Sequence, residues 1–258
     1  MARSTFYYYL KQLDQPDKYA SLKSAVRYIY LRHKGRYGYR RITSCLMQSG
    51  VVINHKTVLK IMKMCGLKSL IRRKKYKSYK GQQGKIASNL LNRNFKASRP
   101  YKKLVTDVTE FAVDGAKLYL SPIMDLYNGE IISYNLSERP DFAQIMDMLH
   151  KAFVRIPEKA RPILHSDQGW QYQMRLYQGY LKGKKVKISM SRKGNCLDNA
   201  AMESFFSILK SELFYTRKFD SISTLKREII KFIDYYNNDR IKLKLNGLSP
   251  VNYRTQAA

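Results

Sequence analysis

The sequence predicts an α/β core, with a mixed sheet flanked by helices, preceded by a small all-α domain. Three observations predict it. Residues 1–100 carry 24 basic and two acidic residues, whereas residues 101–258 carry 25 basic and 17 acidic ones. Before residue 70, apolar side chains recur at helical spacing. After Pro100, strand-like segments with a hairpin signal give way to alternating helices and strands, the pattern of an α/β sheet protein.

The formal net charge of +30 over 258 residues is the first indication of function. Self-repulsion of this size destabilises a compact fold unless a polyanion neutralises it, and phosphates of a nucleic acid do so directly. A ribosome-associated protein and a membrane surface are the alternatives that charge alone leaves open. The sequence has no apolar run of 18 residues and no signal-peptide pattern, and its three cysteines are far apart. We therefore expect a cytoplasmic protein that does not enter a membrane, without a disulfide framework or zinc site.

Three helices are predicted in residues 1–70, over Tyr19–His33, over Tyr39–Gln48, and between Asn54 as N-cap and Gly66 as the C′ residue. Two short helices joined by a turn, the second with a basic outer face, follow the helix-turn-helix plan of DNA-binding domains. Neutral packing of three helices is the alternative interpretation. The candidate DNA-binding residues here are Arg40, Arg41, Lys56, Lys60 and Lys63.

Residues 71–99 are predicted to be a basic linker before a core over residues 100–258. Its start, RRKKYKSYK at 72–80, is poor in aliphatic residues, which is typical of a solvated segment that also follows DNA. The candidate phosphate contacts in it are Arg72, Arg73, Lys74 and Lys75.

Strands are predicted over Leu104–Val113, Lys117–Leu126 and Gly129–Leu136, with Asn128-Gly129 as the hairpin signal between the last two. The remaining predicted elements are helix Phe142–Arg155, strand Pro162–His165, helix Tyr172–Leu181, strand Val186–Met190, helix Asp198–Tyr215 and helix Thr224–Asn237. Three strands in a hairpin series followed by helix–strand–helix–strand–helix is the order of the ribonuclease H-like fold.

Three carboxylates in this framework are candidates for a metal site. Asp107 lies within the first predicted strand, Asp167 just past the fourth, and Glu203 in the first turns of a long helix. A charge in an apolar strand is costly unless it is paired or bound to metal. Oxygen ligands of this kind suit Mg²⁺, and two such ions can stabilise both the attacking and the leaving oxygen of an in-line displacement.

At 100° per residue, Asn199, Glu203, Ser207 and Lys210 form one polar stripe on that helix, with Phe206, Leu209 and Leu213 beside it to pack on the sheet. Lys210 would then hold a phosphate near the metals. Structural roles stay open for each carboxylate, and Glu110, Asp114 and Asp125 are rivals. His165 is interpreted as a structural histidine, with a metal-ligand role as the alternative. Trp170 and Tyr172 are interpreted as aromatics that anchor a loop, with base stacking as the alternative.

At these residues the chain resembles bacterial insertion-sequence transposases of the DDE, retroviral-integrase-like class, more narrowly the second-frame proteins of the insertion-sequence-three family. The motifs are TDVTEF with Asp107, HSDQGWQY with Asp167 and DNAAMESFFSILK with Glu203. The 35 residues between Asp167 and Glu203, and Lys210 seven after Glu203, match the family's signature. The front YGYRRITSCLMQSGVVINHKTVLKIMKMCGL and the tail YYNNDRIKLKLNGLSPVNY are also family-like, so the resemblance covers nearly the whole chain. Leu104 and Lys242 depart from residues common in the family, Trp and His.

The resemblance implies a metal-dependent DNA transposase. A strand at the element end is hydrolysed, and the released 3′-hydroxyl attacks a second phosphodiester, with no covalent protein–DNA intermediate. Asp107 would bridge two Mg²⁺ ions, which Mn²⁺ replaces, while Asp167 and Glu203 each hold one; Lys210 completes the catalytic set. A non-catalytic regulator derived from a transposase and a nuclease without strand transfer are the rivals.

The family also implies the partners of the chain. These are double-stranded DNA of the element ends and target, further copies of the chain on that DNA, and an upstream first-frame protein or frameshift fusion. The expected location is the bacterial cytoplasm, in association with the nucleoid.

Overall fold

The computed structural model describes residues 2–7, 17–70, 86–192 and 196–256, and the chain divides into two compact units at residue 71. The four candidate cations at positions 72 to 75 lie outside the described residues. Within the described ranges, no helix is long and apolar enough to cross a membrane.

The first unit is a three-helix bundle of α2 (Ala20–Arg32), α3 (Tyr39–Gln48) and α4 (His55–Met64). The predicted apolar faces are buried, with Val26, Ile42 and Val58 each fully inaccessible to solvent. Both predicted ends of α4 are confirmed. The Asn54 side chain accepts from the Lys56 N–H at 2.8 Å, and Gly66 adopts a φ of +68° just after the helix.

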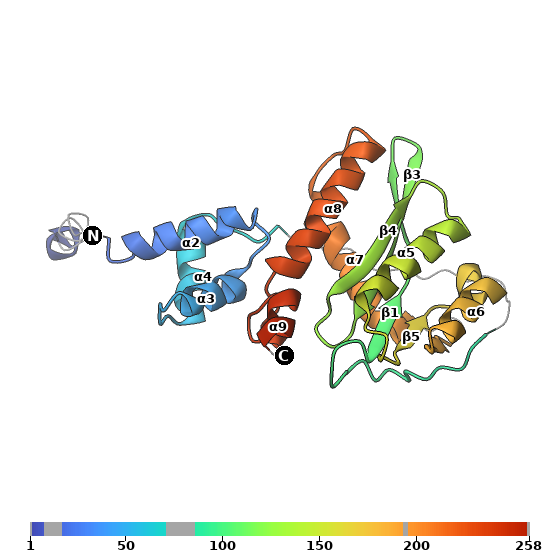
Figure 1. Ribbon diagram of the computed structural model, residues 1–258. Coiled ribbons are helices and arrows are strands. Elements are labelled where there is room, and N and C mark those ends of the chain that lie inside the picture. Colours follow the sequence, from blue (N-terminus) through green and yellow to red (C-terminus); the bar gives the residue numbers. More distant parts are fainter. Residues whose placement is uncertain (1, 8–16, 71–85, 193–195, 257–258) are drawn as a thin grey trace. The chain divides into compact units, whose positions relative to one another are not determined.

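The second unit is built on a six-stranded mixed sheet with helices on both faces (Figure 1). The strands are β1 (Lys103–Thr106), β2 (Thr109–Val113), β3 (Ala116–Asp125), β4 (Ile131–Ser137), β5 (Ile163–Ser166) and β6 (Lys187–Met190). β3 pairs with β2 and β1 one after the other along one edge and with β4 along its other edge. From β1 the sheet continues to β5 and then β6. β1, β5 and β6 are parallel, and the pairs that include β3 are antiparallel.

Two hydrophobic cores lie on opposite faces of this sheet. α5 (Phe142–Arg155) and α6 (Arg175–Gly183) cover one face (Figure 1). α7 (Ala200–Glu212) and α8 (Ile222–Asn238) cover the other, and the short helix α9 (Pro250–Gln256) follows. Neighbouring β1 residues belong to different cores, Leu104 to the first and Val105 to the second, as strand alternation requires. The predicted ribonuclease H-like order is confirmed.

The single strand predicted over Leu104–Val113 is wrong in its middle, where the chain forms β1 and β2 with Asp107 between them. The register pairs Thr106 with Ile123 and Thr109 with Leu120, so Asp107 lies opposite Pro122. Proline has no N–H to donate to the ladder, and the Pro122 carbonyl accepts from the Thr106 hydroxyl at 2.9 Å. The ladder is therefore interrupted at Asp107.

Most other predicted ends differ by one or two residues, and two predicted helices include 3-10 turns. The helix predicted from Tyr172 begins as a 3-10 turn, Trp170–Gln173, before α6. The long helix predicted over Asp198–Tyr215 is α7 between two 3-10 turns, Cys196–Asn199 and Phe214–Thr216.

Residues 86–99, assigned from the sequence to the linker, pack on the second unit. Leu91 is buried in the core beside α7. The backbone N–H groups of Leu90 and Leu91 both donate to the Ser189 hydroxyl of β6. One buried apolar side chain and bonds to an edge strand hold this part of the segment on the sheet, which its basic composition did not predict.

The tail, from the last turns of α8 onward, is joined to the β3–β4 hairpin by hydrogen bonds and an ion pair. The Asn237 side chain donates to the Ile131 carbonyl and accepts from the Ile131 N–H, both at 2.9 Å. Lys242 donates to the Gly129 carbonyl at 3.1 Å. Arg254 of α9 forms an ion pair with the buried Glu130 at 2.6 Å. The family-like tail therefore has a structural function.

Candidate active site

Asp107 follows the last residue of β1, where the ladder is interrupted. One carboxylate oxygen accepts from the Val108 N–H at 2.7 Å, and the other from the Asn199 amide at 3.3 Å. Burial, together with the nearby negative charges of Asp167 and Glu203, holds the pKa of Asp107 well above its usual range. Asp167 and Glu203 are therefore both close enough to Asp107 to repel its negative charge.

Asp167 follows β5, the parallel neighbour of β1. The register pairs Val105 with His165, and continuing it by two residues sets Asp107 level with Asp167. Adjacent strands are about 4.8 Å apart, and side chains two residues apart on a strand point to the same face of the sheet. Asp107 and Asp167 therefore lie side by side, on the same face, where β1 and β5 end. The Gly169 N–H donates to Asp167 at 2.9 Å, while burial raises the pKa of this carboxyl.

Glu203 lies in the first turn of α7 and is half-buried. As predicted, Phe206, Leu209 and Leu213 are buried on the flanking face of this segment and belong to the core beneath the sheet. Their packing fixes the rotation of α7, and the charge of Glu203, on the adjoining face of the helix, acts on Asp107 at the end of β1.

Lys210 lies two turns further along α7. Its ammonium group is 5.3 Å from the centre of the Phe111 ring on β2. Burial lowers the pKa of Lys210, while the charges of Glu110 and Asp107 act in the opposite direction. The structure thus brings this lysine into the electrostatic field of Asp107.

Asp167 and Glu203 lie near Asp107, but the three side chains do not converge on one point as ligands of a bound metal ion would. Among the described residues, no three His, Cys, Asp or Glu side chains are arranged to hold a metal ion. Within the same ranges, neither Asp107 nor Asp167 has a lysine or arginine at ion-pair distance. Asp107 and Asp167, buried and held by amide N–H donors, are oxygen ligands of the kind that a divalent cation binds.

The rival carboxylates have other partners. Asp125 is fully buried and accepts from the N–H groups of Tyr101 and Tyr127 at 2.8 and 2.9 Å. Glu110 accepts from Lys117 at 3.2 Å on the exposed face of β2. Asp114 is exposed in a two-residue turn with Gly115, both at positive φ, which suits an Asp-Gly hairpin.

His165 and the two aromatic residues lie as the sequence suggested, with one exception. His165 is buried between the hydroxyls of Ser189 and Ser191, at 2.8 and 3.2 Å, and burial lowers its pKa. Tyr172 is fully buried, whereas Trp170 is 55% exposed and so anchors little.

Asp198 is a residue that sequence reasoning missed. It is fully buried and accepts from Arg192, Arg93 and Asn89, which ties residues 86–99 to the start of α7. The side-chain bond from Arg192 is the main reason that the pKa of Asp198 lies below its usual range. Its sequence context suggests that Asp198→Asn is a harmless control, but these partners make it unsuitable. An Asp-Asn pair before a helix signals only a cap, and its long-range partners are invisible in the sequence.

The candidate DNA-binding cations of the first unit are mostly on its surface. Lys56, Lys60 and Lys63 are exposed along one face of α4, and Arg40 is exposed at the start of α3. Arg41 is half-buried, with its guanidinium 5.5 Å from the centre of the Tyr37 ring.

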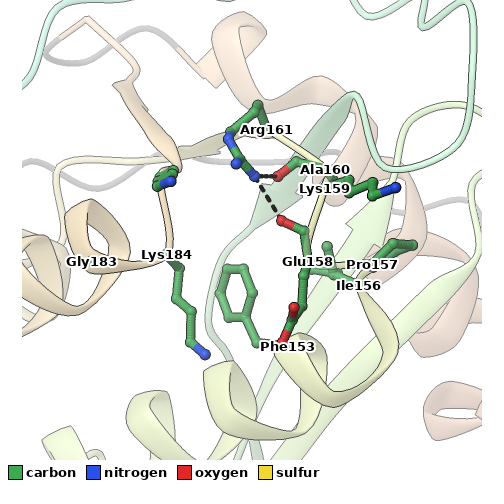
Figure 2. A pocket seen from close by; sticks show the side chains of 10 residues that line it. Phe153, Ile156, Pro157, Glu158, Lys159, Ala160, Arg161, Gly183 and Lys184 are labelled. Carbon is green, nitrogen blue, oxygen red and sulfur yellow. Dashed lines mark hydrogen bonds between the residues drawn. The ribbon is translucent and has the colours of Figure 1, made fainter.

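A cavity of about 390 Å³ lies at the opposite end of β5 from Asp167, between the loop after α5 and the end of α6 (Figure 2). Phe153 and Ile156 supply apolar walls and Lys184 a basic one. Arg161 donates to the carbonyls of Glu158 and Ala160, which fixes it in the rim. This cavity is not part of the carboxylate site.

Comparison with known families identifies both units. Residues 97–196 and 203–257 match families described as an integrase core domain, and residues 17–75 match an HTH-like domain.

Two transposases of Escherichia coli strain K12 are among the relatives. One, described as the putative transposase InsK for insertion sequence element IS150, is 56% identical over 98% of this chain and 90% of its own length. The other, the transposase InsF for insertion sequence IS3A, is 34% identical over 90% of this chain and 82% of its own length.

Among solved structures, the HTLV-2 integrase catalytic core domain in complex with magnesium aligns with a TM-score of 0.49 and 16% identity. The alignment covers 61% of this chain and 98% of that one.

Proposed function

The chain belongs to the insertion-sequence-three family of DDE transposases, and we propose that Asp107, Asp167 and Glu203 are the carboxylates with which it cuts and joins DNA. The observation that carries this proposal is the parallel register of β1 and β5, which sets the two aspartates side by side. The pKa of Asp107, raised by burial and then by the two other acids, supports the grouping.

Asp107, Asp167 and Glu203 would together hold two Mg²⁺ ions. When bound, such ions stabilise the attacking and leaving oxygens of an in-line displacement. The chain's own contribution is to hold three oxygen ligands at the edge of the sheet and to keep Lys210 within reach of a phosphate. No serine or tyrosine nucleophile is required, because water and then a DNA 3′-hydroxyl attack phosphorus.

The cleavage assay tests this proposal. A labelled terminal repeat incubated with the chain is expected to give nicked and joined products with Mg²⁺ or Mn²⁺. With Ca²⁺, whose looser geometry suits the chemistry poorly, DNA binding should persist with little product. Product formation that survives EDTA would exclude a metal mechanism.

We further propose that residues 1–70 bind duplex DNA and that the basic residues Arg72, Arg73, Lys74 and Lys75 contact its phosphates, with several copies of the chain on one DNA and an upstream-frame partner. The exposed face of α4 is the surface that supports this best, because Lys56, Lys60 and Lys63 lie on it together. Association with the nucleoid follows from DNA binding.

Replacing Lys56, Lys60 and Lys63 together with alanine is expected to weaken DNA binding and to flatten its salt dependence. Each phosphate that is no longer neutralised lowers the slope of log affinity against log salt by about 0.9, so three such phosphates lower it by roughly 2.7. Binding titrations of the full chain between 50 and 200 mM salt measure this slope. Lys23→Ala is the matched control, because Lys23 is on α2 and pairs with Asp17. An unchanged slope in the triple variant would mean that this face does not contact DNA.

A further inference from the structure

Asn199 occupies the N-cap position of α7, one turn before Glu203, and is only 4% exposed. Asparagine at this position ordinarily accepts a hydrogen bond from the first turn of its own helix. The Asn199 side chain forms no such bond. Instead, its amide nitrogen lies 3.3 Å from both the Thr106 carbonyl and the Asp107 carboxylate.

This amide joins two elements that are far apart in the sequence. Thr106 and Asp107 form the end of β1, and Asn199 begins the helix that carries Glu203. The two Asp107 oxygens are then fixed separately, one by the Val108 N–H and the other by the Asn199 amide. A carboxylate bound at both oxygens has a set orientation, which is what residues behind metal ligands provide.

The carbonyl oxygen of Asn199 is buried and has no hydrogen-bond partner among the residues that the structure describes. A buried acceptor left without a donor destabilises the protein. Rotating the amide by half a turn would not relieve it, because the carbonyl would then face the two oxygens of Thr106 and Asp107. The two bonds of the amide nitrogen therefore set the orientation of the Asn199 side chain. The carbonyl oxygen can then accept a hydrogen bond from a group outside the described residues.

We propose that Asn199 is a positioning residue for the metal site: its amide nitrogen orients Asp107, and its carbonyl accepts from an O–H or N–H that arrives with the metal or the DNA. This proposal rests on the assignment of Asp107 as a metal ligand. The proposal gives Asn199 no role as a metal ligand, so its donor group, and not its oxygen, is the part expected to matter for metal affinity.

Two substitutions separate these roles. Asn199→Ala removes both the donor and the acceptor, whereas Asn199→Asp removes the donor alone and keeps an acceptor, now charged, beside Asp107. Both are expected to weaken Mn²⁺ binding to the DNA-free protein by about 10–100-fold, the usual effect of losing a residue behind a ligand. Electron paramagnetic resonance of free Mn²⁺ measures this affinity, and the Mg²⁺ concentration for half-maximal cleavage should rise in parallel.

Asn237→Ala is the matched control, since Asn237 also clasps a strand backbone but lies at the β3–β4 hairpin. It should lower the melting temperature and leave Mn²⁺ affinity unchanged. Mn²⁺ affinity within twofold of the parent in Asn199→Ala, or tighter binding in Asn199→Asp, would overturn the proposal; the second result would make Asn199 a ligand.

Asp107→Asn in the same titration distinguishes failure of the inference from failure of the proposed function. Unchanged Mn²⁺ affinity in Asp107→Asn would refute Asp107 as a ligand and the inference with it. Weakened affinity in Asp107→Asn beside an unchanged Asn199→Ala refutes the inference alone.

Discussion

Substituting Asp107 with asparagine, Asp167 with asparagine or Glu203 with glutamine is expected to abolish strand cleavage and strand transfer together, each by at least about 10³-fold. Each change keeps the side-chain shape and removes one negative charge. An amide is a much poorer ligand for Mg²⁺ than a carboxylate. Because both chemical steps would use the same ions, both should fail in the same variant. Gel assays with a labelled, uncleaved end and with a pre-cleaved 3′-hydroxyl end measure the two steps separately.

DNA binding should survive in these variants, because it depends on cations and each substitution removes a repelling charge near DNA. Asp114→Asn is the matched control: it makes the same chemical change at an exposed turn residue, in a backbone conformation that asparagine tolerates. It should cleave and join normally. If Glu203→Gln retained joining while Glu212→Gln lost it without unfolding, the third ligand would be misassigned.

Replacing Arg240 with alanine is expected to be the most destabilising single change outside the carboxylate site, by about 3–5 kcal/mol. Arg240 and Glu212 form two charge-assisted hydrogen bonds, at 2.9 and 2.6 Å, with both side chains 3% exposed. Removing the guanidinium leaves the Glu212 carboxylate buried without its counter-charge. Because Glu212 ends α7, the loss should also loosen the helix that carries Glu203. Urea unfolding of the full chain measures the free-energy change.

Two variants show whether the buried charge is the cause. Lys231→Ala breaks an exposed ion pair with Glu228 and should cost less than about 1 kcal/mol. Replacing Arg240 with methionine and Glu212 with leucine together should recover most of the stability, because a buried pair replaced by apolar side chains is often neutral. A double variant as unstable as Arg240→Ala would point to poorer packing, not to an unpaired charge.

Local signals determined much of the first unit and parts of the second. The bounds of α3 and α5 were predicted to the residue, since each apolar face repeats at helical spacing between clear end signals. Asn54 and Gly66 fixed the ends of α4 for the same reason. These features depend on residues within one or two turns of each other, which a sequence displays directly.

The candidate carboxylates were also visible in the sequence, because a charge at the end of an apolar strand destabilises the fold unless it is paired or binds a metal. Their assembly was not visible. The level placement of Asp107 and Asp167 comes from the β1–β5 register, between segments about sixty residues apart. The interruption at Asp107 comes from Pro122 across the ladder, which no local pattern reveals.

By itself, the sequence determined the family, the order of helices and strands, and the acids suited to a metal site, because these follow from local periodicity and motif spacing. Only the tertiary structure decided which polar groups support that site. Asp198 and Asn199 look locally like helix caps, yet one binds residues 86–99 and the other the end of β1. A short polar side chain has several local uses, and only the fold determines which distant partner it meets.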